Sequence, residues 1–334
     1  MHPFSYARPD SPAAAVRALA EGRPDTRFIA GGTTLYDLMK LDVEAPASVV
    51  DVSRLHDLAR FDTANPRELA FGAAALMSDV AADPLLTRDY PALSESLAKA
   101  ASQQLRNMAT VGGNLLQRTR CAYFRGGEPF ACNKRTPGSG CSAIGGLDRG
   151  HAVLGGSSSC IAVFPGDWPV ALVAFDAQLD TLSPRGERTI PIESLHREPG
   201  DSPHIETTLA PDELIVRIRV PATPLGRASC YHKIRDRESY AFALASAAVA
   251  LDMDGDTVRE ARVAVGGVAT RPWRAREAER ALAGRALTDA TARAAGDAAF
   301  ASAKPGRDNA FKIDLGARTV ADALMIAKAR VRHS

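Results

Sequence analysis

The chain has 334 residues, 46% of them hydrophobic and 24% charged, which is enough for two or three packed domains and unlike a disordered chain. Its 41 basic and 39 acidic residues leave a formal charge of +2, which gives no indication of a nucleic-acid or anionic-membrane partner. No run approaches the roughly 20 apolar residues of a membrane span, and the first residues lack the apolar segment of an export signal.

The N-terminal part alternates strand and helix signals. Strands are predicted over 4–9, 26–30 and 48–53, and helices over 12–21 and 35–40. The first helix begins at Ser11-Pro12 and stops at Gly22, because proline favours the first helical turn and glycine the position after the last. The pair Gly31-Gly32 directly follows the second strand, so it lies at a predicted strand-to-helix turn.

The remaining elements change character near Pro221 to Pro224, where we expect a domain boundary. Before it, the pattern predicts a strand and then a helix over 68–84, a helix over 91–107, and strands within 168–182 and 212–221. After it, two long apolar runs over 242–269 are joined through Asp254-Gly255, a strong hairpin signal. Helical segments follow around 273–282, 289–303 and 319–331.

Two glycine pairs predict a phosphate-containing ligand. Glycine lets the backbone adopt positive φ and approach a ligand closely, and free N–H groups at a helix start attract phosphate. Gly31-Gly32 alone is better explained as a tight connection. The second pair lies in Thr110-Val111-Gly112-Gly113-Asn114, which adds a hydroxyl, backbone donors and an amide suited to a flavin nucleotide. Neither G-x-G-x-x-G nor a P-loop occurs, so another flavin-binding scaffold is needed.

At these segments the chain resembles the FAD-binding subunits of molybdenum hydroxylases, a family that includes the medium subunit of carbon monoxide dehydrogenase and the flavin domain of xanthine dehydrogenase. AGGTTLYDLMK is similar to the first FAD loop of that family, and RNMATVGGNL to the second. GDWPVALVAFDA resembles the segment whose acid faces the flavin, and YHKIRDRESYAFALASAAVAL and VGGVATRPWRAREAERAL resemble the C-terminal domain. The match spans nearly the whole chain.

The resemblance implies a set of FAD contacts. The diphosphate would be wrapped by the first loop with a lysine nearby, and the second loop would continue the cradle: Ala30, Gly31, Gly32, Thr33, Thr34, Leu35, Lys40, Thr110, Gly113 and Asn114. Thr34 departs from the acidic or small polar residue common there, which changes the local hydrogen bonding. Asp167 would touch the flavin or ribityl region, and Lys233 would lie against the isoalloxazine. Without the resemblance, Asp167 reads as a turn residue and Lys233 as one of several solvated charges.

Four of the five cysteines are concentrated between the second glycine loop and the acid-bearing segment. Cys121, Cys132, Cys141 and Cys160 lie in an insertion over 115–160 that is rich in glycine and polar residues. Their spacing, C-x10-C-x8-C-x18-C, lacks the C-x2-C knuckles of most structural zinc sites and suits a cluster held by loops. Zinc and disulfides or free thiols are the alternatives, and the absence of a signal disfavours disulfides. Nearby cations could offset the cluster's negative charge: Arg118, Arg120, Arg125, Lys134 and Arg135.

This insertion resembles the subgroup of flavin subunits with an extra [4Fe–4S] cluster, best matched by bacterial periplasmic aldehyde oxidoreductases. The fifth cysteine, Cys230, is predicted to be a buried thiol in a strand. The resemblance implies an α/β (α+β) fold with two domains. An FAD-binding domain of the vanillyl-alcohol-oxidase (PCMH) type would cover 1–222, in subdomains of about 1–57 and 58–222. A smaller C-terminal α/β domain of the carbon monoxide dehydrogenase flavoprotein type would cover 223–334.

The implied function is electron transfer within a heteromeric aldehyde-oxidising molybdoenzyme. No nucleophile–base pair stands out among the scattered histidines, so the flavin supplies the chemistry. Electrons would come from a large molybdenum subunit through [2Fe–2S] centres on a small subunit, in an αβγ heterotrimer, and leave FAD for an external acceptor. A hydroxybenzoyl-CoA reductase-like subunit, a stand-alone flavin oxidase and a zinc-stapled scaffold are the alternatives. We expect a cytoplasmic location, or a periplasmic one reached on a partner's export signal.

Overall fold

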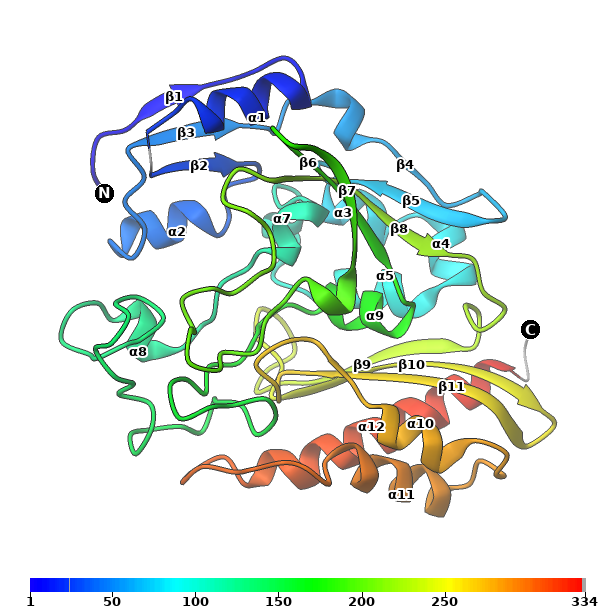
Figure 1. The fold of residues 1–334 in the computed structure, drawn as a ribbon. Coiled ribbons are helices and arrows are strands. Elements are labelled where there is room, and N and C mark those ends of the chain that lie inside the picture. Colours follow the sequence, from blue (N-terminus) through cyan, green and yellow to red (C-terminus); the bar gives the residue numbers. More distant parts are fainter. Residues whose placement is uncertain (24, 332–334) are drawn as a thin grey trace.

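The computed structural model describes residues 1–23 and 25–331. Its N-terminal part is a small parallel sheet with two helices (Figure 1). The elements are β1 (Ser5–Ala7), α1 (Pro12–Ala20), β2 (Thr26–Ile29), α2 (Leu35–Lys40) and β3 (Ser48–Asp51), with strand order β1-β3-β2. The predicted start of the first helix is confirmed, because Ser11 Oγ accepts the Ala14 N–H at 3.3 Å and Pro12 occupies the first turn.

A five-stranded antiparallel sheet forms the middle of the molecule, in the order β4-β5-β8-β6-β7. Its strands are β4 (Phe61–Asp62), β5 (Glu68–Gly72), β6 (Gln178–Ser183), β7 (Gly186–Pro191) and β8 (Leu214–Pro221). The helices of this part are η1 (His56–Ala59), α3 (Met77–Ala81), α4 (Pro84–Asp89), α5 (Pro91–Ala98), α6 (Gln103–Arg106), α7 (Val111–Leu115), α9 (Trp168–Ala174) and η2 (Ile192–Ser194). The core beside the sheet holds Phe71 against Trp168, edge to face at 5.6 Å between ring centroids.

Two predictions about these elements were wrong. The segment 168–174 is helix α9 rather than a strand. The sequence pattern was misleading because all seven residues are buried, so no polar face reveals the helical period. Pro169 occupies its first turn, as in the first helix. The predicted helix 91–107 breaks into α5 and α6, because Ala101 has a φ of 47° and Ser102 caps the second piece.

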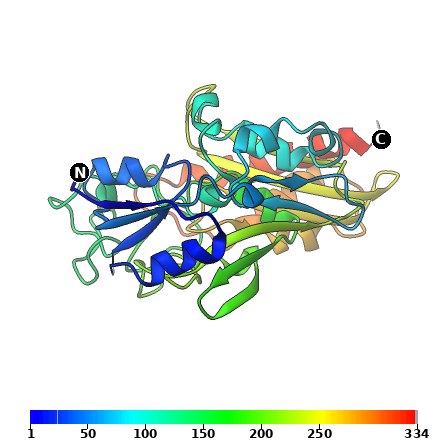
Figure 2. The same cartoon turned by 90° about the horizontal axis from the view of Figure 1, so that it is seen from above.

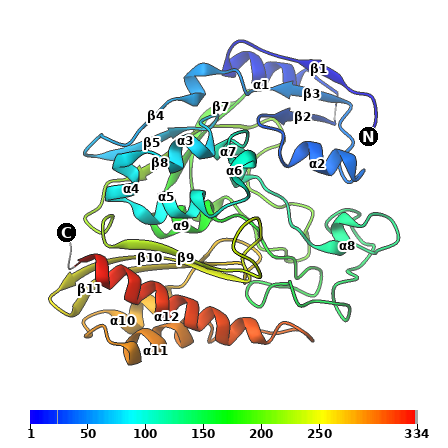
Figure 3. The same ribbon diagram turned by 180° about the vertical axis from the view of Figure 1, so that it is seen from behind.

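The C-terminal part is an antiparallel sheet covered on both faces by helices (Figures 1 and 3). Its strand order is β12-β11-β10-β9, from β9 (Ser229–Ile234), β10 (Ala245–Asp254), β11 (Thr257–Gly266) and β12 (Trp273–Arg274). The predicted hairpin at Asp254-Gly255 is confirmed, with Gly255 at a φ of 57°. Helices α10 (Arg276–Leu282), α11 (Asp289–Ala299) and α12 (Phe311–Val331) form a layer on one side of this sheet, while α5 and α9 pack on the other.

The cysteine-bearing segment is almost free of regular structure. Between α7 and α9 the structure has one short helix, α8 (Ala122–Arg125), within long loops. Figure 2 shows these loops beside the N-terminal sheet at one end of the molecule, away from the C-terminal end of α12. Across the described ranges 1–23 and 25–331, no helix combines the length and apolar character needed to cross a membrane.

Candidate flavin and cluster sites

The two glycine loops touch each other through their backbones. A Cβ built on Gly31 would lie 1.8 Å from the carbonyl oxygen of Met108, which is closer than any side chain permits. Met108 belongs to the second loop, so glycine at position 31 allows the two loops to come together. The structure therefore brings the residues of the two predicted FAD loops into one place, which we call the glycine-loop site (Ala30–Leu35 with Thr110, Gly113 and Asn114).

The glycines of this site have different physical roles. Gly32 has a φ of 72°, and a Cβ there would meet no atom nearer than Ile29 Cδ1 at 3.5 Å. Gly113 likewise faces only the Thr110 hydroxyl, which accepts its N–H at 3.2 Å. Gly112 instead packs against Ala73, where a Cβ would lie 2.7 Å from the Ala73 Cβ. Gly32 is thus open to a ligand, Gly113 is crowded only by the Thr110 hydroxyl, 3.0 Å from its Cβ position, and Gly112 serves packing.

Polar groups of the glycine-loop site are only partly satisfied within the chain. Asn114 is buried, and its Nδ2 donates to Met77 Sδ at 3.4 Å while its Oδ1 has no hydrogen-bond partner. The Thr34 side chain makes no capping hydrogen bond to α2. Lys40, which the resemblance placed near the diphosphate, lies in the last turn of α2 with its ammonium 4.8 Å from the Tyr36 ring centroid. The structure places Lys40 at the end of α2 opposite the glycine pair.

Asp167 and Lys233, predicted separately as flavin contacts, form one buried ion pair. Lys233 Nζ lies 2.8 Å from Asp167 Oδ2, and their side chains are 1% and 5% exposed. The Tyr231 hydroxyl donates to Asp167 Oδ1 at 2.6 Å. Burial raises the pKa of the Asp167 carboxyl, against the opposing effects of Lys233 and Tyr231. Sequence reasoning missed Tyr231. Residues two apart in a strand lie on the same face, so the predicted role of Lys233 could have pointed to Tyr231.

Breaking this pair should be costly. Lys233→Met leaves the Asp167 carboxyl buried without its cation, so we expect the free energy of unfolding to fall by about 3–5 kcal/mol. The double variant Asp167→Asn with Lys233→Met removes both charges and should recover at least half of that loss. Urea unfolding of both proteins measures it, with the exposed Lys304→Met as the control. A loss no larger than that of Lys304→Met would contradict a stabilising pair.

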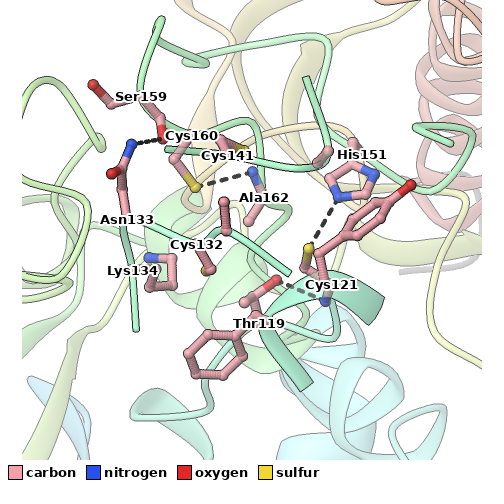
Figure 4. Close-up of a pocket in the computed structure, with 14 residues that line it drawn as sticks. Thr119, Cys121, Cys132, Asn133, Lys134, Cys141, His151, Ser159, Cys160 and Ala162 are labelled. Atoms are coloured by element: carbon pink, nitrogen blue, oxygen red, sulfur yellow. Dashed lines mark hydrogen bonds between the residues drawn. The ribbon is translucent and has the colours of Figure 1, made fainter. Parts of the chain in front are cut away.

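The four clustered cysteines line a single pocket (Figure 4). Each reaches it from a different piece of loop: Cys121 directly precedes α8, Cys132 and Cys141 face each other across an isolated antiparallel bridge, and Cys160 follows a turn closed by Ser157. All are free thiols. The fifth, Cys230, is a buried thiol on β9, as predicted, and its Sγ contacts the Ala323 carbonyl oxygen at 3.1 Å.

The pocket is a poor environment for free thiolates. Burial raises the pKa of the Cys121 thiol to about 11, and burial also raises that of Cys160. Among the residues described, no group of three or more cysteine, histidine or carboxylate side chains converges as a ligand set for one metal ion. Of the five nearby cations, Lys134 lines the pocket. Lys134 also lies 3.6 Å from Glu206 Oε2. Arg118 pairs with Glu44 and Glu206, and Arg125 with Asp37.

His151 also lines this pocket, a residue to which the sequence pattern gave no role. Its Nε2 lies 3.2 Å from Cys121 Sγ. Burial lowers the pKa of the imidazole, which favours its neutral form. No spacing rule could have found this contact, because thirty residues of irregular loop separate the two positions.

Comparison with known proteins identifies the family. Residues 2–223 match the family described as the FAD binding domain in molybdopterin dehydrogenase, and residues 229–325 match the CO dehydrogenase flavoprotein C-terminal domain. The chain belongs to this family. The predicted resemblance, the α/β fold of these two types and the assignment to the flavoproteins of molybdenum hydroxylase oxidoreductases are thereby confirmed.

Individual family members resemble the chain over most of its length. It is 46% identical over 332 residues to the aldehyde oxidoreductase FAD-binding subunit PaoB of Escherichia coli K12, covering 99% of this chain and 100% of that protein. It is 28% identical to the carbon monoxide dehydrogenase medium chain of Hydrogenophaga pseudoflava, covering 91% and 88%. A solved carbon monoxide dehydrogenase structure from that organism superposes with a TM-score of 0.77 and 28% identity over 99% of both chains.

Proposed function

We propose that this chain is the FAD and [4Fe–4S] subunit of a heteromeric, molybdenum-containing aldehyde oxidoreductase. The observation that carries this is the 46% identity to an aldehyde oxidoreductase FAD-binding subunit over essentially the full length of both proteins. The four-cysteine pocket adds a second, independent reason, since a family member that only binds FAD has no need of four free thiols, two of them buried, around one pocket. FAD-binding domain 1–222 and C-terminal domain 223–334 remain our proposed division.

The glycine-loop site fits the diphosphate and ribityl parts of FAD. Gly32 leaves its backbone open to close approach, and Asn114 Oδ1 is a buried acceptor that a ligand donor would satisfy. In this proposal Ala30–Leu35, Thr110, Gly113 and Asn114 hold the nucleotide. When bound, FAD supplies reversible uptake of electrons. In this proposal the Asp167–Lys233 pair, at the junction of α9 and β9, contacts the flavin, as the family resemblance implies.

The cysteine pocket fits a [4Fe–4S] cluster better than a single zinc ion. Each cysteine of such a cluster ligates a different iron, so the thiolates surround a volume and do not converge on one point. That arrangement agrees with four thiols around a common pocket. Binding would require the thiols to lose their protons. The free energy of metal coordination would offset the cost of that deprotonation. Lys134 is the cation placed to offset the resulting negative charge.

The role that follows is to pass electrons. The chain holds a flavin between a donor and an acceptor, and substrate oxidation takes place on a partner with a molybdenum cofactor. A small [2Fe–2S] subunit completes the proposed αβγ assembly.

We expect the chain purified alone, loaded with FAD, to show no aldehyde oxidation. The physical reason is that a flavin can accept electrons only from a donor brought close to it. Adding molybdenum and [2Fe–2S] subunits should restore aldehyde-dependent acceptor reduction. Reduction of the bound flavin by dithionite provides the control that the lone chain is redox-competent. Turnover of aldehydes by the lone chain would contradict the proposal.

A further inference from the structure

His151 lines the cysteine pocket and contacts one of its four cysteines, Cys121. Figure 4 shows the imidazole beside the Cys121 sulfur at the edge of the pocket. The Nε2 to Sγ distance is 3.2 Å, within the range of a hydrogen bond to sulfur. His151 is 7% exposed, and the Tyr123 ring lies beside it with 6.3 Å between ring centroids. The contact is therefore sheltered from water.

The backbone that carries His151 is held by the loop before α12 and by the first turn of α12. The Asp148 carboxylate accepts the backbone N–H groups of Arg307 and Asp308 at 2.8 and 2.7 Å. Asn309 Nδ2 donates to the carbonyl oxygens of His151 and Ala152, both at 3.3 Å. The buried Lys312 ammonium donates to the Gly150 carbonyl oxygen at 3.2 Å and to that of Gly267 at 2.8 Å. These bonds hold the imidazole in place.

The chemistry of the pair decides which atom is the donor. A cysteine sulfur bound to iron is a thiolate and can only accept a hydrogen bond. His151 Nδ1 is buried and has no partner, so no other contact fixes the tautomer. With a thiolate opposite, the neutral imidazole must carry its proton on Nε2.

We propose that His151 donates this N–H to the Cys121 thiolate and thereby raises the reduction potential of the cluster; the inference rests on the [4Fe–4S] assignment above. Reduction adds one electron and one unit of negative charge to the cluster, and a hydrogen bond to a ligand sulfur stabilises the more negative form. The proton stays on His151 throughout. His151 is therefore a positioning and tuning residue, not a cluster ligand.

The test is an EPR-monitored redox titration of the intact chain, with iron and sulfide assayed in parallel. His151→Leu keeps the volume and removes the donor, so we expect a full cluster with a more negative midpoint potential. His151→Gln restores an N–H donor and should return the midpoint close to the wild-type value. His196→Leu is the matched control, a buried histidine that does not line the pocket and bonds to the Leu115 carbonyl oxygen, and it should leave the midpoint unchanged.

A measurement on the unsubstituted protein covers the case in which His151→Leu loses its cluster. With ¹⁵N-labelled histidine, the reduced cluster should show one weak histidine-nitrogen coupling by pulsed EPR. No coupling, a coupling of the strength of a directly bound nitrogen, or an unchanged midpoint in a fully loaded His151→Leu protein would each overturn the inference. Wild-type protein without iron and sulfide would overturn the cluster assignment itself, which keeps the two failures distinct.

Discussion

Replacing Gly32 by valine is expected to abolish FAD binding while the protein still folds. The residue has a φ of 72°, a conformation that costs an L-residue roughly 1–2 kcal/mol and a β-branched one more. Its open side, where the nearest atom is Ile29 Cδ1 at 3.5 Å, would be filled by the valine methyl groups. Close approach of the diphosphate would then be blocked. We expect FAD content to fall to below about a tenth of wild type, measured by absorbance after acid release.

Gly284→Val is the matched control for backbone strain. Gly284 has a φ of 71° and no atom within 4 Å of its Cβ position, and it lies between α10 and α11, outside the glycine-loop site. Both variants should lose similar stability, but only Gly32→Val should lose FAD. Normal FAD content in a folded Gly32→Val protein would refute the loop assignment. In wild type, acid should release all of the flavin, since neither loop offers a cysteine or histidine for covalent attachment.

The second large effect is expected at the cluster cysteines. Serine at Cys121, Cys132, Cys141 or Cys160 should remove most of the iron, because one thiolate ligand of four is lost. The insertion should also loosen, since its loops contain only the short helix α8 and depend on the cluster for cohesion. Iron and sulfide analysis measures the first effect, and the rate of limited proteolysis within 115–160 measures the second.

Cys230→Ser separates cluster loss from a general effect of removing a thiol. Burial raises the pKa of this thiol to about 12, and it lies on β9 against α12, outside the pocket. Its iron content should equal that of wild type, although the serine hydroxyl can cost some stability. Four irons retained in Cys141→Ser, or iron lost in Cys230→Ser, would overturn the ligand set.

Local sequence determined those features that depend on the backbone conformation of one residue or on a short capping or turn motif. The Ser11-Pro12 start of α1 and the Asp254-Gly255 hairpin follow from capping and turn chemistry, which neighbours in sequence provide. The two glycine loops, with the segments around Asp167 and Lys233, carried the resemblance that revealed the family. The clustered cysteines alone left zinc and disulfides open as alternatives to an iron–sulfur cluster.

Tertiary structure decided the features in which distant residues supply the missing half. Helix α9 was misread as a strand because burial on every side erases the polar face that marks a helix in sequence. Asp167 and Lys233 form an ion pair only because the fold places β9 beside the start of α9. In that buried site, either charge would be strongly destabilising without the other. The same holds for His151, which reaches Cys121 because the loop before α12 fastens its backbone. Sequence carries the identity of each group, and packing alone sets which groups meet.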